Sequence, residues 1–221
     1  MLSSKDRKRT LGLSVVSKNQ QKQYVMTMKL RNVPFSPPDM TEAEADEVRE
    51  AILSGWITTG PRTKKLEKEV AEFVGADKAV CLNSQTACAE MALRLRGIGK
   101  GDEVIVPAYT YTASASIVEH VGATLVFVDV QKDCLEMDYE AVEAAITERT
   151  KAIIPVDLAG IPCDYDRLKT IVEAKKSLFK PATDLQQQIG RVAICCDAAH
   201  AFGAERKGVK VGAIADFTSF S

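Results

Sequence analysis

The stretch that most constrains the fold is residues 193–203, a short apolar run that ends on a carboxylate. It reads Ala-Ile-Cys-Cys-Asp-Ala-Ala-His-Ala-Phe-Gly. An apolar run of this length before a polar turn is typical of a buried strand in a parallel sheet. Open parallel sheets bind ligands beyond the carboxyl ends of their strands, so Asp197 is a candidate ligand-binding residue. The alternative, that Asp197 only caps the next turn or helix, stays open on this stretch alone.

Apolar runs alternate with helical patterns along most of the chain. Strands are predicted at 79–82, 103–106, 124–128, 152–156, 193–196 and near 217, and helices at 41–54, 64–73, 87–96, 113–121, 139–147 and 164–174. A polar connection is predicted through 180–188. The short links between these segments predict an α/β fold, a three-layer αβα domain around a mostly parallel, doubly wound sheet.

The beginning of the chain differs from the rest. Residues 1–27 are polar and lack sustained periodicity, so we expect a disordered or weakly ordered tail, with the domain at 28–221. A basic arm that binds nucleic acid is the alternative interpretation, but the rest of the chain is not basic.

The composition narrows the class of protein. The 221 residues are 46% hydrophobic and carry a net charge of -1, which suits one large domain and gives no support for nucleic acid or a membrane surface as partner. No apolar run approaches the roughly 20 residues of a membrane span. The six cysteines lack paired CxxC spacing, which disfavours a disulfide framework and a zinc site. We therefore expect reduced thiols in a cytoplasmic protein without a metal.

Residues 83–86, Asn-Ser-Gln-Thr, follow a predicted strand and open a predicted helix. The first-turn amides of a helix have no backbone partners, and neighbouring hydroxyls add donors, so this turn predicts an anion site that suits phosphate. The alternative is that Ser84 or Thr86 is only an N-cap. A Rossmann dinucleotide site is disfavoured because no G-x-G-x-x-G lies between a strand and a helix, and a Walker loop is absent as well.

Aromatic and ionisable residues follow two other predicted strands. Tyr109 and Tyr111 lie where an aromatic ring can stack on a planar ligand, although either could be a packing residue. A buried Asp197 carboxylate could hold a pyridine nitrogen protonated, which makes the ring an electron sink of the kind used in pyridoxal phosphate chemistry. His200 could orient Asp197, cover such a cofactor or be an ordinary half-buried histidine. His120 is expected to be structural.

Taken in order, these motifs resemble the DegT/StrS-type family of pyridoxal-phosphate-dependent sugar aminotransferases, which have the aspartate aminotransferase fold. The matching segments are 55–61 (Gly-Trp-Ile-Thr-Thr-Gly-Pro), 83–87, 101–111, 150–156 and 197–204. The resemblance covers about residues 28–221 and implies the N-terminal part of the family's large domain. It implies pyridoxal 5′-phosphate as cofactor, an amino-acid donor such as glutamate, and a nucleotide-linked keto sugar as acceptor. It also implies a homodimer and a role in cell-wall or polysaccharide biosynthesis.

The resemblance also implies roles for individual residues. Thr86, with the backbone around Gln85 and Ala87, would bind the cofactor phosphate, although the family often has a small residue where Gln85 stands. Ser221 would also contact the phosphate. Tyr111 would stack on the ring, and Asp197 would pair with the ring nitrogen. The segment at 55–61 would reach toward the dimer interface, with Thr58 and Thr59 binding substrate.

One departure from the family pattern concerns the catalytic lysine. The family's Schiff-base lysine comes five positions after the serine that Ser221 matches, so no residue of this sequence is expected to take its place. Lys207 and Lys210 are out of register, in a turn expected to face solvent. Two other interpretations therefore stay open. One is a non-catalytic fragment that binds at most cofactor or a partner subunit, and the other is a sugar dehydratase in which histidine replaces the lysine. The chain by itself is expected to be inactive in transamination.

Overall fold

The computed structural model describes residues 32–221, so the predicted tail at 1–27 lies outside the described residues. The described residues divide into two units, 32–57 and 58–221. Helix α3 (Glu42–Leu53) lies in the first unit and buries none of its residues. It begins at the predicted capping box. The Thr41 side chain accepts a hydrogen bond from the Glu44 amide, and the Glu44 side chain accepts one from the Thr41 amide.

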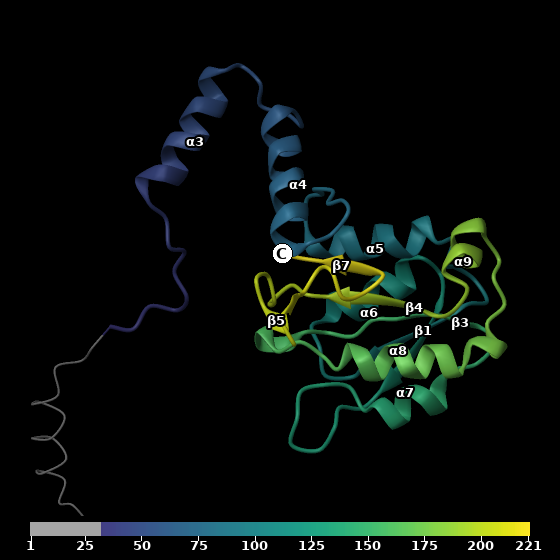
Figure 1. Cartoon of the computed structure of the whole chain (residues 1–221). Helices are drawn as coiled ribbons and strands as arrows, with labels where there is room; N and C mark the ends of the chain where they lie inside the picture. The colour runs from purple at the N-terminus through teal and green to yellow at the C-terminus, as the bar shows by residue number, and fades with distance from the viewer. Residues whose placement is uncertain (1–31) are drawn as a thin grey trace, which may run out of the picture. The chain divides into compact units, whose positions relative to one another are not determined.

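A parallel sheet of five strands forms the centre of the second unit (Figure 1). The strand order is β2-β1-β3-β4-β7, and every neighbouring pair is parallel. The strands are β1 (Glu103–Pro107), β2 (Thr124–Val128), β3 (Thr150–Ile153), β4 (Ala193–Asp197) and β7 (Phe217–Ser219). Because β2 and β3 lie on opposite sides of β1, the winding reverses there, and a ligand crevice is expected beyond the carboxyl ends of β1 and β3.

Helices cover both faces of the sheet, so the predicted three-layer αβα fold is confirmed (Figure 1). Helices α5 (Gln85–Leu95) and α6 (Thr112–His120) pack on one face, and α7 (Tyr139–Ala145) and α8 (Tyr165–Ala174) pack on the other. The remaining elements of this unit are α4 (Pro61–Val74), α9 (Asp184–Ile189), the 3-10 helices η1 (Leu158–Gly160) and η2 (Lys176–Leu178), and the hairpin strands β5 (Glu205–Arg206) and β6 (Val209–Lys210).

The alternation of side chains along β4 determines which helical layer Asp197 faces. Side chains alternate between the two faces of a strand. Cys195 belongs to the core under α5 and α6, whereas Ile194 and Cys196 belong to the core under α7 and α8. Asp197 therefore faces the α5 and α6 layer. Burial raises the pKa of the Cys195 thiol to about 12 and that of Cys196 well above its ordinary value, so both are protonated packing residues rather than nucleophiles.

Two predicted elements are wrong. The segment at 79–82 is no strand, because no segment within 32–221 pairs with it. Val80 and Leu82 are exposed, and the Cys81 amide donates instead to the Glu67 carboxylate at 2.9 Å. The connection at 180–188 contains helix α9, which Thr183 caps and Gly190 ends. That cap pair was a readable signal for a helix.

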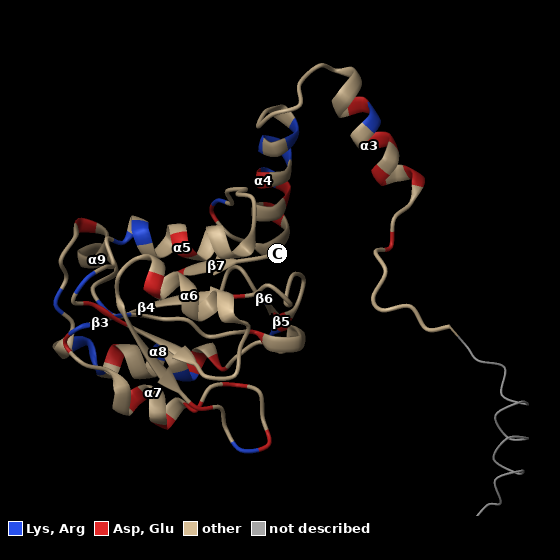
Figure 2. Cartoon of the chain, turned by 180° about the vertical axis from the view of Figure 1, so that it is seen from behind, with Lys and Arg blue, Asp and Glu red and all other residues tan. Residues whose placement is uncertain are grey.

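The described residues carry mixed charge, with acidic and basic side chains interspersed along the helices (Figure 2). None of the helices among residues 32–221 is both long enough and apolar enough to cross a membrane. All six cysteines lie within this range as free thiols.

A buried carboxylate supports β4 from the α7 and α8 side. Asp157 is fully buried, and its Oδ1 accepts hydrogen bonds from the Cys163 amide at 2.9 Å and the Tyr165 hydroxyl at 2.8 Å. Its Oδ2 accepts from the Cys196 thiol at 3.3 Å. The Asp157 amide in turn donates to the Asp197 carbonyl at 2.9 Å, so this cluster fixes the backbone on which Asp197 stands.

This cluster gives a pH-dependent stability with a defined sign. Burial raises the pKa of the Asp157 carboxyl above its unfolded value, so the native state binds that proton more tightly than the unfolded chain does. Asp157 therefore contributes stability at low pH that is lost as pH rises through the raised pKa. We predict that the free energy of unfolding of the native chain, minus that of Asp157→Asn, decreases from about pH 4 upward. Asparagine keeps an acceptor for Cys163 and Tyr165.

Urea unfolding across a pH series measures this difference. Asp166→Asn is the matched control, because Lys207 lowers the pKa of the Asp166 carboxyl. The free energy of unfolding of the native chain, minus that of Asp166→Asn, must therefore increase with pH. A difference for Asp157→Asn that is flat or increases with pH contradicts the prediction.

Candidate active site

Asp197 ends β4 and is 5% exposed. Its Oδ2 accepts a hydrogen bond from Ser114 Oγ at 2.7 Å, and its Oδ1 accepts one from the Ala199 amide at 3.2 Å. Both donors are neutral, and no cationic side chain among residues 32–221 forms a salt bridge with Asp197. A carboxylate offers about four lone-pair positions. Asp197 therefore keeps acceptor capacity for a further donor, and a cationic N–H group would suit it best.

Ser114 reaches Asp197 from the first turn of α6. Thr110 Oγ1 lies 2.9 Å from Ser114 Oγ. Because Ser114 gives its only hydroxyl proton to Asp197, Thr110 must donate to Ser114, and the three side chains form one directed chain. The sequence analysis missed Ser114 and Thr110. A small polar residue on the buried side of the helix after β1 was the only signal for Ser114.

The predicted anion turn opens α5. Ser84 is the N-cap, and its hydroxyl accepts from the Ala87 amide at 3.1 Å. The capping alternative is thus correct for Ser84 but not for Thr86, which is half-buried in the first turn. The amides of Gln85 and Thr86 have no acceptor within the described part of the chain, as expected at a helix start. They remain available to an anion.

The structure brings this helix start and Asp197 to the same edge of the sheet. Gln85 Nε2 donates to Ser219 Oγ at 2.9 Å, and Ser219 is the register partner of Asp197 across β4 and β7. Ser219 is another residue that the sequence analysis missed, since its partner lies 134 positions away.

Tyr111 also lies near this edge. It precedes α6, and its carbonyl accepts a hydrogen bond from the Ser114 amide at 3.2 Å, so it is within one turn of the residue that contacts Asp197. Its side chain is 78% exposed and that of Tyr109 is 58% exposed. Neither tyrosine is therefore a core packing residue. Stacking of Tyr111 on a ligand stays a prediction.

His200 is exposed and contacts η1 rather than the carboxylate. Its Nδ1 accepts from the Ala159 amide at 3.3 Å, which places the ring proton of the neutral form on Nε2. The donors to Asp197 come instead from Ser114 and Ala199. The proposed orienting role of His200 thus has no support in these contacts, while its covering role stays a prediction.

Thr58, Thr59 and Ser221 are exposed. The two threonines precede α4, whose far end packs on the body of this unit through the stacked rings of Phe73 and Phe202, 5.2 Å apart. The 14 residues of α4 span roughly 20 Å, so the threonines stand about that far along the helix from the Phe73 contact. Their role, and that of Ser221, stays a prediction.

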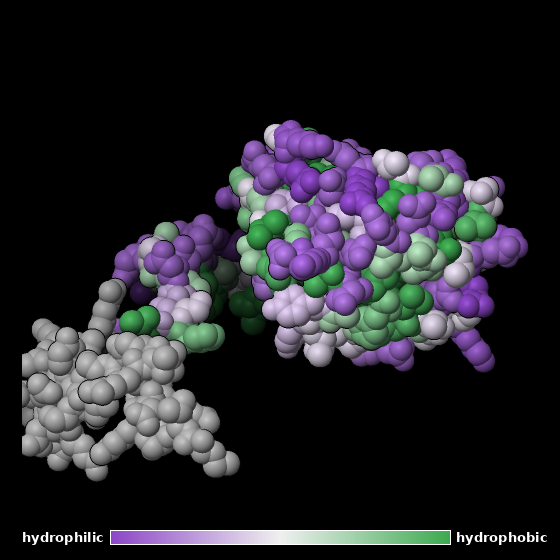
Figure 3. All heavy atoms as spheres, turned by 90° about the horizontal axis from the view of Figure 1, so that it is seen from below, coloured by the Kyte–Doolittle hydropathy of each residue, from purple (hydrophilic) through white to green (hydrophobic). Residues whose placement is uncertain are grey.

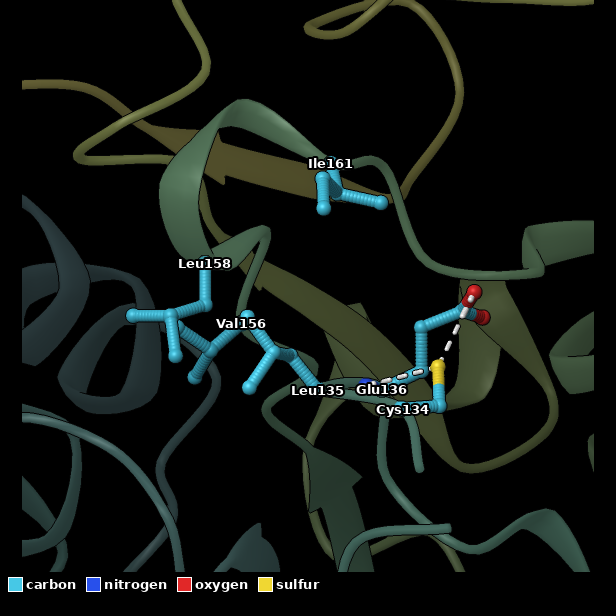
Figure 4. Close-up of a pocket in the computed structure, with 6 residues that line it drawn as sticks. All are labelled: Cys134, Leu135, Glu136, Val156, Leu158 and Ile161. Carbon is cyan, nitrogen blue, oxygen red and sulfur yellow. Dashed lines mark hydrogen bonds between the residues drawn. The ribbon is translucent and has the colours of Figure 1, made fainter. Parts of the chain in front are cut away.

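Neither of two cavities found in the second unit is lined by a predicted site residue. Figure 4 shows the smaller one, where Leu158, Val156 and Leu135 lie together and Cys134 is hydrogen-bonded to Glu136. Its volume is about 30 Å³, enough for about one water. The larger one, about 270 Å³, lies along α4 and residues 76–79. The candidate site is therefore built on the sheet edge and the α5 amides.

A parallel sheet between helical layers, with a buried carboxylate and a helix start at its carboxyl edge, defines the large-domain fold of pyridoxal-phosphate-dependent transferases. The sequence pattern of the DegT/DnrJ/EryC1/StrS aminotransferase family matches residues 38–221, and the chain belongs to this family. The predicted family is thereby confirmed.

Known relatives are about twice as long as this chain. Spore coat polysaccharide biosynthesis protein SpsC of Bacillus subtilis (strain 168) is 40% identical over 189 residues, which are 86% of this chain and 45% of SpsC. The putative sugar aminotransferase Spr1654 from Streptococcus pneumoniae is 57% identical with a TM-score of 0.86, covering 86% of this chain and 48% of that one. An aminotransferase from Psychrobacter cryohalolentis is 36% identical with a TM-score of 0.74, covering 85% and 45%.

The Streptococcus pneumoniae protein has been solved in apo, PMP and PLP forms, so the cofactor predicted for this chain is one that this relative holds. The comparisons thus show the fold and the family, whereas the roles of individual residues stay predictions.

We predict that Ser114→Ala lowers the free energy of unfolding by about 1.5–3 kcal/mol, because it removes a buried hydrogen bond to a charged group. Urea unfolding of the ligand-free chain measures the change. Ser116→Ala is the matched control on the same helix, since the Ser116 hydroxyl donates only to the Ala113 carbonyl within α6. Equal effects of the two substitutions would show that Ser114 does not support Asp197.

Proposed function

We propose that this chain is the cofactor-binding part of a pyridoxal-phosphate-dependent aminotransferase. The reaction would move an amino group from an amino acid, glutamate, to the keto group of a nucleotide-linked sugar. The observation that carries the proposal is Asp197, a buried carboxylate with only neutral donors, at the same sheet edge as the open amides of α5. The family membership and the sugar aminotransferases among the relatives support it.

The residues present fit this cofactor. The amides of Gln85 and Thr86, with the Thr86 hydroxyl, would bind the phosphate, and Ser221 would add a donor. Asp197 would accept the hydrogen bond of the protonated ring nitrogen, and Tyr111 would stack on the ring. When bound, the cofactor supplies an electron sink for the substrate carbon that loses a proton.

The residues of this chain would bind and orient the cofactor and hold a proton on its ring nitrogen. Asp197 keeps the proton on the ring nitrogen, because an opposite charge at hydrogen-bond distance favours the protonated form of that nitrogen. Thr110 and Ser114 fix the carboxylate in place through their directed hydrogen bonds. The α5 amides would bind the phosphate through groups that already lack partners within the described residues.

Transamination also requires a base that moves a proton at the substrate carbon. Lys207 forms an ion pair with Asp166, and the Lys210 ammonium lies 3.8 Å from the centre of the Phe73 ring. Both lysines are thus held by other side chains. We therefore propose that a polypeptide of these 221 residues binds the cofactor without sustained turnover.

The proposal predicts which substitution weakens cofactor binding. Pyridoxamine phosphate should bind the native chain, and Asp197→Asn should weaken its affinity about 10- to 100-fold, the range for a lost charge-assisted hydrogen bond. Calorimetric titration measures both affinities. Asp129→Asn, at the exposed exit of β2, is the matched control and should bind like the native chain.

Turnover is assayed as 2-oxoglutarate formed from pyridoxal phosphate and glutamate, and we expect none above a protein-free control. Turnover that survives Asp197→Ala would mean that the site is assigned wrongly. Turnover that is lost on Asp197→Ala would show that another group, such as His200, takes the part of the base.

We also propose that the protein assembles as a homodimer. Large apolar side chains beside the two threonines of the 55–61 segment are exposed, with Trp56 at 59% and Ile57 at 77%. Hydrophobic patches lie among hydrophilic ones on the surface of the second unit seen from below (Figure 3). Exposed apolar patches often mark protein–protein contacts. A second copy would cover it and bring Thr58 and Thr59 toward a nucleotide-sugar site.

Sedimentation of the purified chain tests this assembly. We expect self-association at micromolar concentration, and we expect Ile57→Asp to shift the equilibrium toward monomer. Val209→Asp, at a half-exposed valine of β6, is the control and should leave the equilibrium unchanged. A well-folded native chain that sediments only as monomer contradicts the proposal.

A further inference from the structure

A run of buried hydrogen bonds joins the two ends of the candidate site. The side chain of Gln85, the first residue of α5, is almost completely buried, and its Nε2 donates to Ser219 Oγ at 2.9 Å. Ser219 Oγ donates in turn to the Cys196 carbonyl at 3.1 Å, and the Ser219 carbonyl accepts from the Ala198 amide at 2.9 Å. Ser219 therefore holds the backbone on both sides of Asp197.

The direction of these hydrogen bonds is fixed by the number of protons. Ser219 has one hydroxyl proton, which goes to the Cys196 carbonyl, so its oxygen needs a donor from α5. The amide of Gln85 supplies that donor. The flipped amide would place its oxygen against a hydroxyl that has no second proton to give. The Gln85 amide must therefore point its nitrogen at Ser219. A shorter side chain, or one without an amide, leaves the Ser219 hydroxyl without this donor.

The two ends that this run connects are the ends of the proposed ligand. The α5 amides would take the phosphate, and Asp197 would take the ring nitrogen. The phosphate and the ring nitrogen are at fixed positions in pyridoxamine phosphate. Affinity is therefore highest when the α5 amides and Asp197 are held at the matching separation before binding. Gln85 and Ser219 are the described side chains that tie α5 directly to the end of β7, beside Asp197.

We propose that the Gln85–Ser219 pair is a positioning device that sets the separation between the α5 amides and Asp197. The pair selects ligands that carry an anionic group and a ring nitrogen at one fixed distance. This inference rests on the proposed function. It adds a role for the Gln85 side chain, where the resemblance gave only a role for the backbone, and it adds Ser219 to the site.

The proposal predicts different effects for two kinds of ligand. A two-ended ligand contacts both the α5 amides and Asp197, and a one-ended ligand contacts only one of them. Loss of the Gln85–Ser219 hydrogen bond removes no group that would contact the ligand, so a ligand that uses one end binds nearly as before. A ligand that uses both ends must order them itself and binds more weakly. Pyridoxamine phosphate is the two-ended probe, and pyridoxamine and inorganic phosphate are the one-ended probes.

The experiment measures the dissociation constants of the three probes by calorimetry for the native chain, Gln85→Met, Ser219→Ala and the double variant. Gln85→Met keeps the side-chain volume and removes the hydrogen bond. We expect each single substitution to weaken pyridoxamine phosphate about tenfold, the effect of one lost buried hydrogen bond. Affinities for the one-ended probes should stay within about twofold. The double variant should be weaker than either single variant by far less than the product of the two effects.

Two substitutions outside the pair serve as controls. Gln187→Met replaces an exposed glutamine of α9, and Ser116→Ala replaces a half-buried serine of α6. Both should bind all three probes like the native chain. Gln85→Asn keeps the amide on a shorter arm and should behave like Gln85→Met, which supplies a second test if the methionine variant does not fold.

The outcomes separate the inference from the function on which it rests. Unchanged pyridoxamine phosphate affinity in Gln85→Met and Gln85→Asn, with native binding intact, overturns the inference alone. Equal losses for all three probes also overturn it, because the pair would then act only through general stability. A native chain that binds none of the probes overturns the proposed cofactor site, and the inference with it.

Discussion

The candidate site depends on the Asp197 carboxylate, which is buried with no cationic partner among residues 32–221. Burying an unpaired carboxylate costs several kcal/mol, and that penalty must be offset by hydrogen bonds. At Asp197 the donors are a serine hydroxyl and a backbone amide, both neutral. They stabilise the carboxylate but leave its charge uncompensated. The site is therefore prepared for a ligand that brings a positive N–H group, and the elements around β4 serve to hold that arrangement.

The carboxylates of Asp157 and Asp197 lie on opposite faces of the sheet, because side chains alternate along β4. Cys196 points to the α7 and α8 side, where Asp157 accepts three internal hydrogen bonds and has a raised pKa because of its burial. Asp197, one residue further on, points to the α5 and α6 side and retains acceptor capacity. Asp157 consequently supports the strand, whereas Asp197 has acceptor capacity left for a ligand.

The sequence predicted the parts of the site that have a local signature. An apolar run ending on Asp197 and a hydroxyl-rich turn at 83–86 are local patterns. The first correctly predicted a strand that ends at Asp197, and the second correctly predicted a helix start. Ser114 and Ser219 had no such signature, because their partners lie 83 and 134 positions away and only the folded sheet brings them together. The false strand at 79–82 has the same cause. Its apolar residues fit a strand, but pairing depends on a neighbour that local sequence does not specify.

The site residues fall into two groups by what holds them. Gln85, Ser114 and Asp197 stand at the ends of regular elements and are buried in hydrogen bonds, so their positions are set before any ligand arrives. Tyr111 and His200 are exposed on the connecting segments and have few contacts of their own. The groups proposed to bind a phosphate and a ring nitrogen thus lie on the part of the sheet edge that hydrogen bonds hold in place. The exposed positions are the ones at which a change of residue costs the fold least.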